Sequence, residues 1–221
     1  MGDYRVIEVK RSVLEGNDRE ADELRACNEA RGLCLVNLMG SPGAGKTTLL
    51  ARTVRHLAAE MRIGVMEADI DADVDAARMA ATGARTIQLH TGGMCHLDAG
   101  MCAQGLDELG AEGLDLVFLE NVGNLVCPAE FDTGATVSAM VLSVPEGDDK
   151  PLKYPLMFEV CDLVVVSKTD VAPYFDFDFE RFRANVAARN PDAVVLPLSA
   201  KAGENMHPWY EWLRTQVANV R

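Results

Sequence analysis

The sequence predicts an α/β fold, with a doubly wound and mostly parallel β-sheet covered by helices. Three observations support this prediction: apolar runs of strand length, helix-length stretches between most of them, and a glycine-rich loop directly after the first apolar run. Unbroken apolar runs are typical of strands that are covered on both faces, as in a parallel sheet. Because ligands of such folds bind at the carboxyl ends of the strands, we expect the functional residues to follow these runs.

The expected elements alternate along the chain. Residues 12–31 predict an N-terminal helix, because the stretch is polar and places Leu24 and Cys27 on one face. The run LCLVNLM, residues 33–39, predicts the first strand. Further strands are expected at residues 63–66, 114–119, 136–144, 163–166 and 193–198. Further helices are expected at residues 47–61, 75–81, 98–109, 177–190 and 206–220.

The chain length and composition fit a single α/β domain with a short appendage. It has 221 residues, of which 48% are hydrophobic and 25% are charged. No internal repeat, low-complexity tract or linker rich in Pro, Gly and Ser divides it. We expect residues 1–32 to form a helical extension packed on a domain formed by residues 33–221.

The net charge argues against nucleic-acid partners, and the lengths of the apolar runs argue against a membrane-spanning segment. A net charge of -13 is opposite to the basic surface that nucleic-acid phosphates require. No apolar run approaches the roughly 20 residues of a membrane helix, and no signal peptide is evident. We therefore expect a cytoplasmic protein without nucleic-acid or membrane partners. Its six cysteines would stay reduced there, which leaves them available to bind metal.

A phosphate-binding loop follows the first expected strand. The stretch GSPGAGKTT satisfies G-x-x-x-x-G-K-[ST] between a strand and a helix, a context that argues against a mere helix-capping turn. Backbone N–H groups of such a loop cradle phosphates, Lys46 reaches the terminal phosphates, and Thr47 offers a hydroxyl to Mg²⁺. The predicted nucleotide-binding residues of this loop are Gly40, Ser41, Gly43, Ala44, Gly45, Lys46, Thr47 and Thr48.

Acidic residues at two strand ends are candidates for completing a Mg²⁺ site. Asp69 closes the run that begins IGVM, and Glu120 closes LDLVFLE. Hard cations prefer oxygen ligands, and both carboxylates belong at the edge of the sheet that presents ligands. We therefore predict that Thr47, Asp69 and Glu120 hold Mg²⁺, and that Lys46, Asp69 and Glu120 take part in catalysis.

A second motif predicts the base pocket. Lys168 and Asp170 have the K-x-D spacing that grips guanine in GTPases. An Asp carboxylate accepts hydrogen bonds from guanine N1–H and its exocyclic amine, whereas adenine presents an acceptor at N1. The sequence LSAKAG resembles the S-A-K loop of such pockets and contributes Ser199, Ala200 and Lys201. Ser167 stands where GTPases usually have Asn, which weakens the expected support of the loop more than the choice of guanine.

Together these motifs resemble the hydrogenase nickel-incorporation GTPases, the HypB family. The matching stretches are GSPGAGKTTLL, TGGMCHLDAGM, LENVGNLVCPAEFDTGA, EGDDKPLKYPLMF and SKTD. The resemblance implies a P-loop NTPase of the signal-recognition and MinD type, whose members dimerise around nucleotide. The related urease accessory GTPase has Cys-Pro-His where this chain has Cys95-His96, and it lacks the N-L-V-C-P segment; it remains an alternative.

The resemblance also implies a metal site at the dimer interface. The family's metal ligands match Cys95, His96 and Cys127 of this sequence, so the resemblance implies that these three residues bind the metal. Three ligands per chain are too few for a closed tetrahedral zinc site, whereas two chains supply enough for two ions with shared thiolates. Thiolate and imidazole suit both Zn²⁺ and Ni²⁺. Cys102, seven residues after Cys95, is a conceivable further ligand.

One family feature has no counterpart in this sequence. Many members begin with a Cys-rich nickel motif, but here no Cys precedes Cys27 and no His precedes His56. We therefore expect metal only at the interface site, with a partner nickel chaperone as a source of nickel.

The function implied is a GTP-hydrolysing metallochaperone that helps deliver nickel to [NiFe]-hydrogenase. GTP, GDP, Mg²⁺ and Ni²⁺ or Zn²⁺ are the expected cofactors, and a homodimer, a nickel chaperone and the hydrogenase large-subunit maturation machinery are the expected partners. Two hypotheses from other classes of protein function stay open. One is an ATP-dependent small-molecule kinase, which would bind ATP with the same P-loop. The other is a binding module with a structural zinc.

Overall fold

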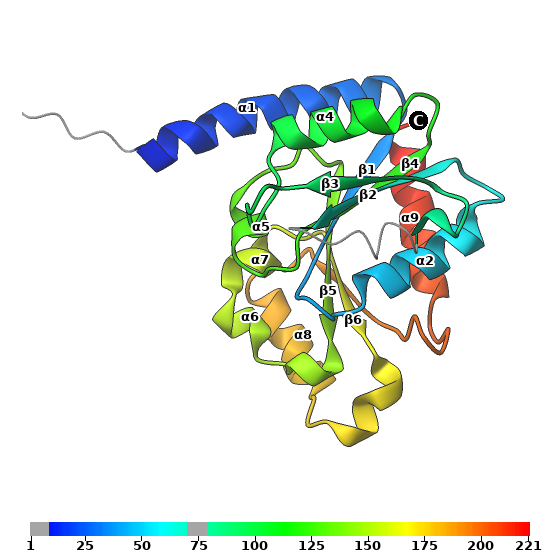
Figure 1. The fold of residues 1–221 in the computed structure, drawn as a ribbon. Helices are drawn as coiled ribbons and strands as arrows, with labels where there is room; N and C mark the ends of the chain where they lie inside the picture. The colour runs from blue at the N-terminus through cyan, green and yellow to red at the C-terminus, as the bar shows by residue number, and fades with distance from the viewer. Residues whose placement is uncertain (1–8, 70–78) are drawn as a thin grey trace, which may run out of the picture.

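The computed structural model describes residues 9–69 and 79–221, with side chains for 14–68 and 79–221 (Figure 1). Within these residues one parallel sheet has seven strands in the order β3-β2-β4-β1-β5-β6-β7. The predicted α/β, doubly wound fold is therefore confirmed. The strands are β1 (Cys34–Met39), β2 (Ile63–Asp69), β3 (Arg85–His90), β4 (Leu116–Glu120), β5 (Val137–Ser143), β6 (Leu163–Ser167) and β7 (Val194–Pro197).

Helices cover both faces of the sheet. The described α-helices are α1 (Val9–Ala30), α2 (Lys46–Leu57), α4 (Ala99–Leu109), α5 (Cys127–Glu130), α6 (Lys150–Lys153), α7 (Pro155–Glu159), α8 (Phe179–Ala187) and α9 (His207–Asn219). The 3₁₀ turns are Val144–Glu146 and Thr169–Tyr174. Of the helix expected at residues 75–81, residues 79 and 80 are helical and most of the rest lies outside the described residues.

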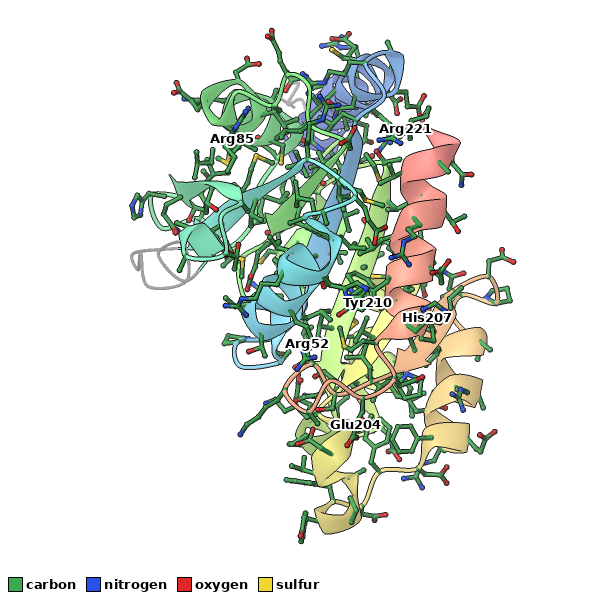
Figure 2. All side chains as sticks on the ribbon, turned by 90° about the vertical axis from the view of Figure 1, so that its right-hand side faces the viewer. Arg52, Arg85, Glu204, His207, Tyr210 and Arg221 are labelled. Carbon is green, nitrogen blue, oxygen red and sulfur yellow. The ribbon has the colours of Figure 1, made fainter. Side chains whose placement is uncertain are left out.

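One face of the sheet packs against α2 and α9. Alternate residues of β1, such as Val36 and Leu38, point into this core, because successive strand side chains point to opposite faces. Trp209 of α9 is fully buried there and donates a hydrogen bond from Nε1 to Thr53 Oγ1 of α2 at 2.8 Å. The two helices lie side by side in Figure 2, which labels Tyr210 and Arg52 where they meet.

The opposite face carries two separate sets of helices. Leu35 and Met66 pack with Leu106 of α4 over one half of the sheet, and α1 lies along α4 (Figure 1). Over the other half, Met140 of β5 packs with residues of α7 and α8, including Phe182. The predicted N-terminal helix is thus present and packed on the sheet domain.

The largest difference from the sequence prediction is β3, which was not expected. Its sequence RTIQLH has polar residues between and around the apolar ones, and it forms an edge of the sheet with only β2 as its neighbour. Edge strands are less covered and do not need an unbroken apolar run, so the criterion that found the central strands missed this one.

No helix among the described residues is long and apolar enough to span a membrane.

Candidate nucleotide and metal sites

The phosphate-binding loop lies between β1 and α2, at the carboxyl edge of the sheet. Gly40 has φ 141°, and a Cβ there would collide with the carbonyl oxygen of Val141 on β5. Gly45 has φ 105° and immediately precedes α2. Glycine is required at both positions because L-residues with side chains rarely adopt such angles. The loop therefore has the backbone path that lets N–H groups turn inward.

Lys46 is buried at the start of α2 and spans the loop. Its Nζ donates hydrogen bonds to the carbonyl oxygens of Gly40 at 3.1 Å and Ser41 at 3.4 Å. The side chain is thus held under the loop, where its charge adds to the positive potential of the helix N-terminus. This is the position from which an ammonium group reaches bound phosphates.

Thr47 and Glu120 are in contact, as expected for a shared cation site. Thr47 Oγ1 donates to Glu120 Oε1 at 2.9 Å, and the Glu120 side chain is 6% exposed at the end of β4. Asp69 ends β2, but its side chain lies outside the described residues. A hydroxyl and a carboxylate oxygen are the donor set that Mg²⁺ prefers, so these two residues fit the ion.

Two further polar side chains, Glu67 and Gln88, line the same cavity and were not predicted. Glu120 on β4, Glu67 on β2 and Gln88 on β3 are in register across neighbouring strands. With the phosphate loop they line a cavity of about 520 Å³. Among the described residues, no partner hydrogen-bonds the buried amide of Gln88. The sequence signal for Glu67 was a charged residue inside an otherwise apolar strand.

The predicted base-pocket residues surround a separate cavity of about 250 Å³ beside the phosphate loop. Lys168, Asp170, Ser199, Ala200 and Lys201 all line it. Ser199 Oγ donates to Asp170 Oδ1 at 2.6 Å, which orients the carboxylate, and leaves Oδ2 as a second acceptor for a base.

Ser167 explains how the pocket is supported without the usual Asn. Its Oγ donates to the carbonyl oxygen of Ala44 in the phosphate loop at 2.5 Å. Lys168 adopts a left-handed conformation with φ 59°, and its Nζ donates to the Gly43 carbonyl at 2.7 Å. The two motifs are therefore tied together by direct hydrogen bonds, and the hydroxyl of Ser167 makes one of them.

The predicted metal ligands come together from two segments. Cys95 and His96 lie between β3 and α4, and Cys127 begins α5 after β4. The Sγ atoms of Cys95 and Cys127 are 2.7 Å apart, and Cys95 Sγ is 4.0 Å from His96 Nδ1. The imidazole of His96 stacks on the ring of Phe131 with 3.8 Å between centroids. All three side chains are partly exposed. Thiolate sulfur is the donor type that soft cations prefer.

The ionisation of Cys95 depends on its close contact with Cys127. The pKa of Cys95 is raised, mainly by its hydrogen bond with Cys127, then by burial and by the nearby negative charges. Two adjacent thiolates repel each other unless a positive charge lies between them. Within the described residues, no group of three or more His, Cys, Asp or Glu side chains is arranged to hold a metal ion by itself. Cys95, His96 and Cys127 of one chain therefore do not form a complete coordination sphere in the described residues.

Cys102 does not belong to the cluster. It lies on the buried side of α4, packed with Leu97, Leu106 and other apolar residues, and burial raises the pKa of its thiol far above the usual range. A buried thiol of this kind behaves as a small apolar side chain. Cys34 and Cys161 are buried as well.

The family model for the CobW/HypB/UreG nucleotide-binding domain matches residues 34–197. The chain is 48% identical to the hydrogenase maturation factor HypB of Azotobacter chroococcum mcd 1, over 96% of this chain and 70% of the relative. The chain belongs to the HypB family. It is also 45% identical to the HypB of Escherichia coli strain K12, over 98% of this chain and 74% of that protein. The resemblance inferred from the sequence motifs is thereby confirmed.

Solved structures of the HypB family have the same fold. The HypB structure from Archaeoglobus fulgidus is 36% identical with a TM-score of 0.86, covering 92% of this chain and 100% of that chain. HypB from Helicobacter pylori in complex with nickel gives the same identity and TM-score, covering 92% and 96%. The signal recognition particle 54 kDa protein from Aeropyrum pernix, at 13% identity and a TM-score of 0.57, shares the fold alone.

Proposed function

We propose that this protein is a GTP-hydrolysing metallochaperone that helps deliver nickel during maturation of [NiFe]-hydrogenase. The observation that carries the proposal is the contact between Cys95 and Cys127, 2.7 Å apart, on segments that follow β3 and β4. The same β4 ends at Glu120, which bonds Thr47 of the phosphate loop. The proposed metal site and the proposed nucleotide site would therefore share one short connection, residues 120–127.

Guanine is the proposed base. Asp170 keeps one carboxylate oxygen for Ser199 and presents the other to the pocket. A carboxylate pairs with the two N–H donors of guanine and would be left unpaired by adenine, which favours GTP over ATP by this pocket chemistry. The proposal therefore disfavours the alternative of an ATP-dependent small-molecule kinase.

Hydrolysis in this proposal is attack of water on the γ-phosphate. The bond from the γ-phosphorus to the β,γ-bridging oxygen breaks, and GDP leaves together with inorganic phosphate. Lys46 and the loop N–H groups stabilise the negative charge that develops. Thr47 and Glu120, with Asp69, would hold Mg²⁺, which would supply further positive charge. Gly40, Ser41, Gly43, Ala44, Gly45 and Thr48 shape the cradle. No arginine finger or catalytic glutamine was identified in the sequence, so slow intrinsic turnover is expected.

The metal is cargo in this proposal, and a homodimer completes its site. Two copies of Cys95, His96 and Cys127 supply six donors, enough for one or two ions of Zn²⁺ or Ni²⁺. The HypB from Helicobacter pylori was solved in complex with nickel, and the curated relatives are named hydrogenase maturation factors. These names support nickel as the cargo and hydrogenase maturation as the process. A nickel chaperone and the hydrogenase large-subunit machinery as partners, and a cytoplasmic location, are further parts of the proposal.

The test is a Zn²⁺ and Ni²⁺ titration of wild type and Cys127→Ala, with the mass of the protein followed at each point. We expect binding that goes with dimer formation in wild type and a loss of at least tenfold in affinity for Cys127→Ala, which removes one of two thiols. Cys27→Ala is the matched control, since Cys27 is an exposed thiol on α1. Equal metal binding by Cys127→Ala and wild type would remove the metallochaperone function and leave a GTPase.

A further inference from the structure

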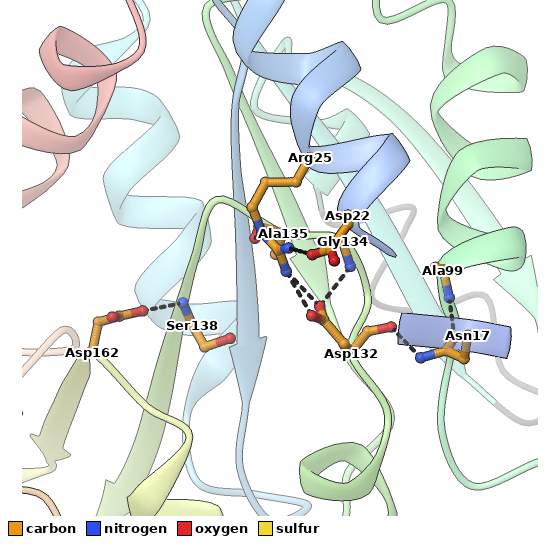
Figure 3. Close-up of polar contacts among 9 residues, drawn as sticks. All are labelled: Asn17, Asp22, Arg25, Ala99, Asp132, Gly134, Ala135, Ser138 and Asp162. Atoms are coloured by element: carbon orange, nitrogen blue, oxygen red, sulfur yellow. Dashed lines mark hydrogen bonds and ion pairs between the residues drawn. The ribbon is translucent and has the colours of Figure 1, made fainter. Parts of the chain in front are cut away.

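One buried amide joins the two segments that carry the candidate metal ligands. Asn17 of α1 donates from Nδ2 to the carbonyl oxygen of Asp132 at 2.9 Å, and its Oδ1 accepts from the backbone N–H of Ala99 at 2.9 Å (Figure 3). Its side chain is 7% exposed, so water competes little for either bond. A single side chain therefore connects three elements that are distant in the sequence.

The two atoms that Asn17 bonds are close in sequence to the ligands. Ala99 begins α4 and comes three residues after His96; Asp132 comes five residues after Cys127. Between them, Phe131 stacks on His96 at 3.8 Å, so the segments also meet at the ligand itself. A shift of the Ala99 N–H or of the Asp132 carbonyl oxygen would therefore also move a ligand side chain a few residues away.

The helix that carries Asn17 is itself fixed to the second segment. Arg25 donates from Nη2 to both carboxylate oxygens of Asp132, at 2.8 and 2.6 Å, and from Nε to the Ala135 carbonyl at 3.0 Å (Figure 3). Gly134, with φ 70°, packs so closely on α1 that a Cβ would lie 2.9 Å from a methyl group of Leu24. The position of Asn17 relative to the loop after α5 is therefore well determined.

We propose that Asn17 is a positioning residue for the metal site, an inference that rests on the proposed metal binding by Cys95, His96 and Cys127. A shared ion requires each sulfur within about 2.3 Å of the metal, a tolerance that two loops on different strands do not meet by themselves. Outer groups that orient ligands typically contribute 10- to 100-fold to metal affinity. Asn17 does so through the backbone, by fixing the spacing between the two loops.

The test compares Asn17→Ala, which removes both hydrogen bonds, with Asn17→Asp, which keeps the acceptor for Ala99 N–H and loses the donor to Asp132. Asn28→Ala is the matched control, because Asn28 is buried in the same helix and bonds Arg31. All variants carry Cys27→Ser, so that the thiols outside the site are buried. One readout is the Zn²⁺ dissociation constant. The other needs no metal: the equilibrium fraction of a Cys95–Cys127 disulfide in a glutathione redox buffer, which reports how well the two sulfurs are held together.

We expect Asn17→Ala to raise the Zn²⁺ dissociation constant about tenfold. The disulfide equilibrium should fall by a similar factor, while GTP affinity stays within twofold of wild type. Asn17→Asp should move both readouts in the same direction, and Asn28→Ala should move neither. Wild-type values for both Asn17 variants, or equal shifts in Asn28→Ala, would overturn the inference. If wild type binds no metal, the proposed function fails, and the disulfide equilibrium alone decides the positioning role.

Discussion

We call the phosphate loop and the base pocket together the nucleotide cradle, and Cys95, His96 and Cys127 the metal cluster. The two regions differ in how many of their side chains have partners within one chain. In the cradle, Lys46, Thr47, Ser167 and Ser199 all have hydrogen-bond partners within the chain. The cluster has three partly exposed side chains on two loops, with no complete single-chain metal site among the described residues. In the proposed function, one chain suffices to bind nucleotide, whereas a second copy completes the metal site, so assembly would decide when metal is held.

Asp170→Ala should give the largest difference between the two regions, with a strong effect on GTP affinity and none on metal affinity. The substitution removes two charge-assisted hydrogen bonds to guanine, each worth about 1.5–3 kcal/mol, so GTP affinity should fall by about 10²- to 10⁴-fold. The affinity for metal in the absence of nucleotide should not change. Isothermal titration calorimetry with GTP, ATP and Zn²⁺ measures all three.

Asp176→Ala serves as the matched control, because Asp176 is an exposed carboxylate six residues further along the chain. A similar loss of GTP binding in both variants would mean that general negative charge, and not guanine recognition, accounts for the effect.

Lys46→Ala should give the next largest effect, this time on turnover. Removal of one charge-stabilising donor typically lowers kcat by about 10²- to 10³-fold, and Lys46 is the buried ammonium at the phosphate loop. Phosphate release under saturating GTP is the measurement. Arg183→Ala, on the exposed side of α8, should retain wild-type turnover. Normal kcat in Lys46→Ala would exclude Lys46 from the reaction.

Asp115→Asn should give the smallest effect and spare both sites. Asp115 precedes β4 at its amino end and pairs with Arg62 at 2.9 Å and Arg221 at 2.7 Å, the latter labelled in Figure 2. These arginines hold the pKa of Asp115 well below its usual range. Since the folded-state pKa is depressed, the stabilisation is present above the unfolded pKa of about 4 and is lost as pH falls below it.

Asp115→Asn should therefore lower the free energy of unfolding by about 1–3 kcal/mol at pH 7. The gap between variant and wild type should close progressively below about pH 4. Urea denaturation at several pH values measures it. A gap that is the same at pH 7 and pH 3 would rule out the ion pairs as its source.

The sequence predicted the cradle better than the cluster for a physical reason. The loop at residues 40–48 is contiguous, and the guanine motif lies on two short stretches whose backbone conformations follow from local chemistry. The complete set of Cys95, His96 and Cys127 came only from the family resemblance, because ligands on separate loops meet through tertiary packing. Glu67 and Asn17 were missed for the same reason. Nothing in their spacing reveals that one lies in register with Glu120 and the other bonds Ala99 and Asp132.

The division into an extension at residues 1–32 and a domain at 33–221 remains a prediction. Within this range, Asn17 and Arg25 bond the segments that flank Cys95, His96 and Cys127. A helix that polar composition marks as peripheral thus contributes contacts to a candidate site.

In the proposed function, nucleotide state and metal binding are coupled through the short connection between Glu120 and Cys127. The most direct measurement is the Ni²⁺ or Zn²⁺ dissociation constant of wild type with saturating GDP and with a non-hydrolysable GTP analogue. Coupling of about 1–3 kcal/mol predicts a difference of about 5- to 150-fold, and metal should change the affinity for the analogue relative to GDP by the same factor. Identical metal affinities in both nucleotide states would contradict the account.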